Sequence, residues 1–281
     1  MFRVILAAGL LIAAEPGFAQ AQDACQPSPC LVDGGQYRVA LPAIPATEPT
    51  PTVLYLHGYA ASSAAVLRNS GLLQPFLDRG YAVVVPDGQV DTLQGHHLDW
   101  GVRDGFGLPR DDIAFVRQVL ADAATRFSLD PENIVLMGYS RGGSMVWDIA
   151  CHAPDTARAY VSHAGGFWAP LPPQCAASVR LLHSHGFTDR TLPVEGTGME
   201  WFGYSFEVAS VFDGLEVWQR TMGCPPKADT AEVTAAAWTK AWTGCAEGGQ
   251  LTLQLLPGGH GRRAGWAEAV LDWLEPAPDN P

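Results

Sequence analysis

The 281-residue sequence has few basic side chains, and this scarcity restricts what the protein can bind. It contains 17 lysines and arginines against 29 aspartates and glutamates, so its formal net charge is -12. An excess of negative charge opposes binding to nucleic acid and to anionic membrane surfaces. We therefore expect neither as a partner, and we expect a neutral or basic soluble substrate in preference to a polyanion.

Patterns typical of metal sites are also absent. None of the six cysteines belongs to a Cys-x-x-Cys pair or to the paired Cys/His spacing of a zinc site. The histidines His96 and His97 are adjacent, and His183 and His185 alternate, but neither pair resembles a set of metal ligands. We expect no metal and no cofactor.

The apolar run near the amino terminus, residues 4–14, is too short to cross a bilayer. Arg3 precedes it, and Ala19 and Ala21 follow it as the small residues of a cleavage site. This arrangement is typical of a secretory signal. No repeat or second domain is evident, so we predict a signal peptide at residues 1–21 and one catalytic domain at residues 22–281 of a secreted or periplasmic protein.

Six cysteines in an exported chain favour disulfide bonds. Many connectivities are open to six cysteines, and the simplest joins each to its nearest neighbour in sequence. These pairs are Cys25 with Cys30, Cys151 with Cys175, and Cys224 with Cys245.

Short apolar runs of strand character alternate with helical patterns along the chain. This alternation predicts an α/β fold with a mostly parallel sheet and helices on both faces. We expect strands at residues 37–41, 53–57, 81–86, 134–137, 159–164, 179–183 and 251–256. We expect helices at residues 60–79, 111–127, 143–150, 206–222 and 264–274. Residues 87–109 form a long segment with little periodicity, and residues 196–205 are a candidate cap over the site.

A Gly-x-Ser-x-Gly turn stands between the predicted strand 134–137 and the predicted helix 143–150. Strand, tight turn and helix in this order are typical of a nucleophile elbow. Gly138 and Gly142 give the clearance that such a turn needs, because a Cβ there would collide with the neighbouring strand or helix. The pattern predicts that Ser140 is raised above the sheet edge as a nucleophile.

A serine hydroxyl needs a base, and reactive groups in α/β sheets gather at the carboxyl ends of strands. Asp189 and His260 each follow such a strand, so the chain order is Ser140, Asp189, His260, which is the order of the α/β-hydrolase fold. We assign His260 as general base and then general acid, and Asp189 as the group that orients it. Protonation of His260 at low pH should therefore reduce activity.

Two backbone N–H groups are the predicted oxyanion hole: that of Arg141, directly after the nucleophile, and that of Tyr59, after the strand 53–57. Four aromatic residues are candidates for lining the substrate pocket, although each could equally pack in the core. They are Tyr59, Trp100, Trp168 and Trp201.

Several motifs resemble the secreted esterases grouped as polyhydroxybutyrate depolymerase-like and feruloyl esterase-like α/β hydrolases. They lie at residues 32–38, 56–59, 129–131, 138–145, 150–155, 185–189 and 258–260. The resemblance covers most of the mature chain, and it implies Asp189 as the acid and His260 as the base. Cys151 with Cys175, and Cys224 with Cys245, also match cysteine positions of this family. The chain departs from the family after His260, where Arg262 and Arg263 either face solvent or attract an anion.

The resemblance implies a serine carboxylic ester hydrolase that acts through an acyl-enzyme. Its expected substrates are small or oligomeric esters: polyhydroxyalkanoate or other aliphatic polyester oligomers, or hydroxycinnamate (feruloyl) esters. One alternative is a dipeptidyl-peptidase-like serine peptidase, although no additional domain to select peptides is evident. Another is a non-catalytic binding protein on a hydrolase scaffold, which would require a broken triad.

Overall fold

A computed structural model describes residues 25, 28–91, 97–102, 108–201 and 204–275 of the chain. The predicted signal segment, residues 1–21, lies outside the described residues, and so does His96. Within the described ranges, no helix combines the length and the apolar character needed to span a membrane. Across the same ranges, no group of three or more His, Cys, Asp or Glu residues is arranged to hold a metal ion.

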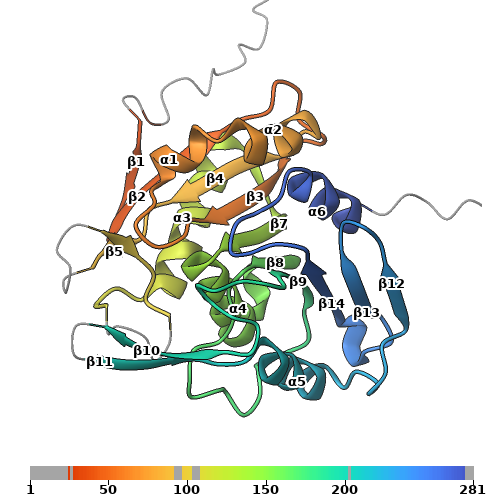
Figure 1. Cartoon of the computed structure of the whole chain (residues 1–281). Coiled ribbons are helices and arrows are strands. Elements are labelled where there is room, and N and C mark those ends of the chain that lie inside the picture. The colour runs from red at the N-terminus through yellow and green to blue at the C-terminus, as the bar shows by residue number, and fades with distance from the viewer. Residues whose placement is uncertain (1–24, 26–27, 92–96, 103–107, 202–203, 276–281) are drawn as a thin grey trace, which may run out of the picture.

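A ten-stranded sheet forms the centre of the structure, with strand order β1-β2-β4-β3-β7-β8-β9-β14-β13-β12 (Figure 1). The six strands from β4 to β14 are parallel, which confirms the prediction of a mostly parallel sheet. The two strands at each edge run antiparallel. In order across the sheet, the strands are β1 (Cys30–Val32), β2 (Gly35–Ala40), β4 (Ala82–Pro86), β3 (Thr50–Leu56), β7 (Leu129–Tyr139), β8 (Ala159–His163), β9 (Arg180–Gly186), β14 (Gln250–Leu256), β13 (Trp238–Trp242) and β12 (Thr230–Val233).

Helices cover both faces of the sheet, and each face has its own hydrophobic core (Figure 1). Successive strand residues point to opposite faces. In β3, Leu54 and Leu56 therefore join one core, whereas Val53 and Tyr55 join the other. The first core holds α3 (Asp112–Phe127), α4 (Arg141–His152) and α5 (Val211–Met222). The second core holds α1 (Ser63–Leu67), α2 (Ser70–Asp78) and α6 (Trp266–Leu274).

The single helix predicted at residues 60–79 is wrong, because two shorter helices, α1 and α2, occupy this stretch. The Asn69 side chain accepts a hydrogen bond from the backbone N–H of Leu72 at 3.2 Å and so caps a new helix start. The start of α3 agrees with the prediction: Asp111 caps it by accepting from the N–H of Ala114 at 3.0 Å.

Antiparallel hairpins are the features that the sequence interpretation missed. The helix predicted at residues 206–222 begins only at Val211, because Phe206 belongs to the hairpin of β10 (Thr197–Trp201) and β11 (Tyr204–Val208). Strand β10 and the first two residues of β11 fall within the candidate cap at residues 196–205. The segment 87–109 contains the short paired strands β5 (Gln89–Val90) and β6 (Leu98–Asp99). Strands β12 and β13 form a further hairpin at the sheet edge.

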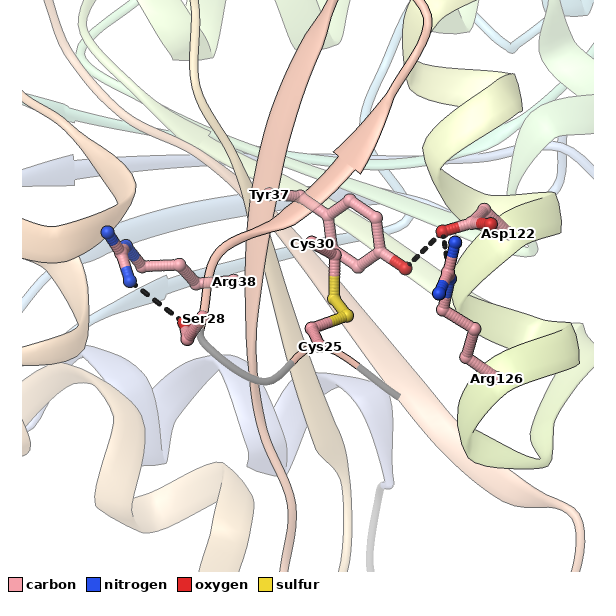
Figure 2. The surroundings of a disulfide bond; sticks show 7 residues. All are labelled: Cys25, Ser28, Cys30, Tyr37, Arg38, Asp122 and Arg126. Atoms are coloured by element: carbon pink, nitrogen blue, oxygen red, sulfur yellow. Dashed lines mark hydrogen bonds and ion pairs between the residues drawn. A yellow bond between two sulfur atoms is a disulfide. The ribbon is translucent and has the colours of Figure 1, made fainter. Parts of the chain in front are cut away.

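Three disulfide bonds join each cysteine to its nearest neighbour in sequence, as predicted. Figure 2 shows the bond between Cys25 and Cys30 beside Tyr37 of β2. The Tyr37 hydroxyl donates to Asp122 of α3 at 2.6 Å, and Arg126 donates to the same carboxylate at 2.7 Å. Strand β2 is thereby attached to α3.

Candidate active site

Ser140 lies in the turn between β7 and α4, with a backbone that few L-residues adopt: φ is 55° and ψ is -121°. A Cβ on Gly138 would come within 2.2 Å of the Gly142 carbonyl oxygen. A Cβ on Gly142 would come equally close, 2.2 Å, to the carbonyl oxygen of Leu56. Both glycines are therefore required for β3, β7 and α4 to approach this closely, which is the clearance that the sequence pattern indicates.

The structure brings Ser140, His260 and Asp189 together. Ser140 follows β7, Asp189 follows β9 and His260 follows β14, and these parallel strands end at the same edge of the sheet. His260 Nε2 lies 2.8 Å from Ser140 Oγ, and His260 Nδ1 lies 2.7 Å from Asp189 Oδ2. Because a carboxylate only accepts, the ring proton is on Nδ1, and Nε2 is left to accept the serine proton.

Asp189 is fixed by hydrogen bonds to both of its oxygens. Its Oδ1 accepts from the backbone N–H groups of Thr191 at 2.8 Å and Leu192 at 3.0 Å, and its Oδ2 accepts from His260. Burial favours the neutral carboxyl, but the bonds from His260 and Leu192 outweigh it and lower the pKa of Asp189. The group is therefore an anion at neutral pH.

A series of buried, hydrogen-bonded side chains ends at Asp189. The Trp147 indole N–H donates to His183 Nδ1 at 3.2 Å, and His183 Nε2 then donates to His185 Nδ1 at 3.1 Å. His185 Nε2 faces the Leu192 carbonyl at 2.7 Å and Asp189 Oδ2 at 3.2 Å. An indole is only a donor, so this order fixes the tautomer of both histidines. The two histidines therefore hold Asp189 in position, an arrangement that the sequence interpretation missed.

Four histidines are buried in the fold, and from their burial we predict that acid destabilises the protein. Burial lowers the pKa of His57 and His185, holds that of His183 well below its usual value and lowers that of His163 to about 4. In the unfolded chain each would protonate near pH ~6.5, so the unfolded state binds more protons below that pH. The contribution of these histidines to the free energy of unfolding is therefore fully present above about pH 6.5, and it declines as the pH falls toward about 4.

We expect each of these histidines, for as long as it stays neutral in the folded state, to remove up to roughly 1 kcal/mol of unfolding free energy per pH unit as the pH falls below about 6.5. Thermal unfolding midpoints measured in steps from about pH 8.5 to about 4.5 check this expectation. The range from about pH 7 to 8.5 is an internal control, because these histidines do not titrate there. A midpoint that stayed constant between about pH 6.5 and 5 would contradict the expectation.

Arg141, the residue after Ser140, forms a buried ion pair with Asp99. Its Nε and one terminal nitrogen donate to the two carboxylate oxygens at 2.9 and 3.0 Å, which is a bidentate geometry. The guanidinium also lies 4.2 Å from the centre of the Trp168 ring. Strand β6 thus fixes the first turn of α4, which gives part of the aperiodic segment 87–109 a role that the sequence interpretation did not identify.

A cavity of about 120 Å³ opens beside the Ser140 hydroxyl. Tyr59 and Trp168 line it, as their candidate role requires. Trp100 does not: it is fully buried, and its indole N–H donates to the His57 carbonyl at 2.8 Å, so it is a core residue. The side chain of Trp201 lies outside the described residues. The remaining lining residues are Asp99, Ser140, Arg141, Thr191, Leu192 and Met199, the last from the β10–β11 hairpin.

Comparison with known sequences points to one family. A sequence profile described as "alpha/beta hydrolase fold" matches residues 51–207, more than half of the chain. The chain is 28% identical over 158 residues to "Putative esterase NocK" of Nocardia uniformis subsp. tsuyamanensis, which covers 55% of this chain and 44% of that protein. The match thus spans less than half of this relative's length.

Solved structures with low sequence identity share the fold. A Bacillus cereus carboxylesterase is 16% identical, with a TM-score of 0.56 over 86% of this chain and 93% of its own. An acetyl xylan esterase from Aspergillus awamori is 11% identical, with a TM-score of 0.59 over 85% of this chain and 93% of its own. With the family profile and the sheet order, these findings show that the chain belongs to the alpha/beta hydrolase fold family.

Proposed function

We propose that the protein is a serine carboxylic ester hydrolase. The observation that carries this proposal is the continuous hydrogen-bonded row from Ser140 through His260 to Asp189. His260 takes the serine proton as Oγ attacks the ester carbonyl, and it returns that proton to the leaving alcohol. Water then attacks the acyl-enzyme with His260 as base, which releases the acid and restores Ser140.

The oxyanion that forms in both steps requires donors on the other side of the carbonyl. We assign this role to the backbone N–H groups of Tyr59 and Arg141. Both residues line the cavity beside Ser140, and Arg141 stands at the positive amino end of α4. The ion pair with Asp99 supports this position by holding Arg141 in place.

The cavity beside Ser140 favours short acyl groups. Its volume of about 120 Å³ is small beside the roughly 300–1,000 Å³ of cavities that hold drug-sized ligands. A four-carbon hydroxyacyl chain suits this space better than a hydroxycinnamoyl ring with its methoxy group. We therefore rank oligomers of 3-hydroxy acids, the aliphatic polyester class, above feruloyl esters as substrates. The disulfides and the signal-like segment at residues 1–21 support action outside the cytoplasm.

A fluorophosphonate probe and two esters test the proposal. Because such probes react only with an activated serine, we expect covalent labelling of the purified mature protein at Ser140. We also expect faster hydrolysis of a 3-hydroxybutyrate oligomer than of methyl ferulate. Absence of labelling together with absence of turnover would overturn the serine hydrolase assignment. A preference for methyl ferulate would overturn only the substrate ranking.

A further inference from the structure

Arg262, two residues after His260, is half-buried against aromatic rings. The carbon at the centre of its guanidinium lies 4.8 Å from the ring centre of Tyr139, 5.4 Å from that of Tyr55 and 5.9 Å from that of Trp266. Burial lowers the pKa of Arg262 to about 10, so it is still a cation at neutral pH. Among the residues that the structure describes, no carboxylate lies within ion-pair distance of it.

A partly buried charge without a counterion is unfavourable, and in proteins such charges are usually paired. Arg141 is paired with Asp99, and Arg110 is paired with Asp112. The half-buried Arg180 has no carboxylate partner among the described residues, but its guanidinium donates to the backbone carbonyls of Trp273 and Leu274. Arg262 differs from these three arginines because, among the described residues, its guanidinium has neither a carboxylate nor another hydrogen-bond acceptor and contacts only aromatic rings.

The guanidinium of Arg262 lines a cavity of about 330 Å³ on the side of the sheet that carries α2 and α6. Its described lining includes Asn69, Tyr139, Arg263 and Trp266, and it contains two arginines and no acidic residue. The lining of this cavity is therefore positively charged, whereas the chain as a whole has a net charge of -12. A field of this kind attracts a single small anion even though the protein as a whole repels polyanions.

This second cavity lies next to the reacting groups. Tyr139 lines it and directly precedes Ser140, which lines the smaller cavity. Gly261 also lines it and directly follows His260. The Tyr139 ring centre is 5.2 Å from that of His260 and 4.8 Å from the Arg262 guanidinium. The leaving alcohol, which receives its proton from His260, would therefore extend toward Arg262.

We propose that Arg262 binds a carboxylate on the leaving alcohol, so that the enzyme cleaves the last ester bond at the free carboxyl end of hydroxy-acid oligomers. This inference rests on the proposed function. Ser140 Oγ forms a bond to the penultimate carbonyl, the ester C–O bond breaks, and His260 protonates the released 3-hydroxy acid. The planar guanidinium suits a carboxylate because it can donate two parallel hydrogen bonds.

The test compares the linear dimer of 3-hydroxybutyrate with its methyl ester, following cleavage of the bond between the two units by chromatography. We expect wild type to prefer the free acid by about tenfold to a hundredfold in kcat/KM, the usual contribution of charged hydrogen bonds. Arg262→Met should bring this ratio close to one, and Arg262→Lys should retain part of it. Arg220→Met, which removes an exposed charge on α5, should leave the ratio as in wild type.

Added salt should weaken the wild-type preference, because it screens a partly exposed ion pair. A wild-type ratio near one, or a ratio that Arg262→Met and Arg262→Lys both leave unchanged, would overturn the inference while the ester hydrolase assignment stands. Turnover of neither dimer by a wild-type protein that a fluorophosphonate labels would overturn the inference alone, and absence of labelling as well would overturn both. Residual cleavage of the methyl ester by Arg262→Met shows that the variant is folded, so that a lost preference is specific.

Discussion

Ser140→Ala should lower kcat for ester hydrolysis by about 10⁴-fold to 10⁶-fold, because it removes the atom that forms the acyl-enzyme. Covalent labelling by a fluorophosphonate should disappear as well. The small remaining rate would come from the oxyanion donors and from substrate binding, which the substitution leaves in place. Measurement of kcat on a 3-hydroxybutyrate oligomer checks the expected loss.

The fold should survive this substitution, because the contacts that hold residue 140 are made by its backbone. Its N–H donates to the His163 carbonyl at 2.9 Å, and its carbonyl accepts from Ser144 N at 2.9 Å. Alanine keeps both bonds. Ser178→Ala is a matched control, since Ser178 precedes β9 at the opposite end of that strand from Asp189. A Ser140→Ala protein that retained a tenth or so of the wild-type rate would contradict the assignment of the nucleophile.

The three groups of the candidate triad could be predicted from sequence because each lies within four residues after the end of a buried strand. In a parallel sheet this position alone places a side chain at one edge, whatever the intervening helices do. The glycines of the elbow carry similar information, since steric clearance is a local property of the turn. Local sequence pattern was therefore sufficient to predict that Ser140, Asp189 and His260 lie close together, and the structure places them within hydrogen-bond distance.

The residues that hold the candidate triad in position could not be predicted from local sequence pattern. Asp99 and Arg141 are 42 residues apart, and no periodicity links a short strand in a loop to a helix start. His183 and His185 did leave a signal: residues two apart in a strand share a face. The predicted strand ended at residue 183, whereas β9 continues to Gly186, so the second histidine was placed in a loop.

The β10–β11 hairpin shows why the prediction failed for short antiparallel elements. Met199 and Phe206 are paired across it, and the alternation of apolar and polar residues in both strands is a strand signal. The following helix, α5, has a strong apolar periodicity of its own, and the predicted helix was extended into the strand. Ser210 marks the true start, because its hydroxyl accepts from the N–H groups of Phe212 and Asp213.

Asp189→Asn should lower kcat by about 10⁴-fold while leaving the shape of the site unchanged. The amide oxygen of asparagine would keep the Oδ1 position, because two backbone N–H groups, those of Thr191 and Leu192, point at it. The amide nitrogen would then take the Oδ2 position. It is a donor, and it would face the N–H groups of His260 and His185, which are donors too.

His260 can resolve this conflict only by moving its proton from Nδ1 to Nε2. The ring would then accept from the amide and point an N–H at Ser140 Oγ, 2.8 Å away, so the serine proton would have no acceptor. His185 keeps its bond to the Leu192 carbonyl, so the chain of buried histidines cannot restore the lost orientation. Kinetics of Asp189→Asn beside Asp272→Asn, an exposed carboxylate on α6, measure the effect. A loss below about tenfold would mean that Asp189 does not set the tautomer of the base.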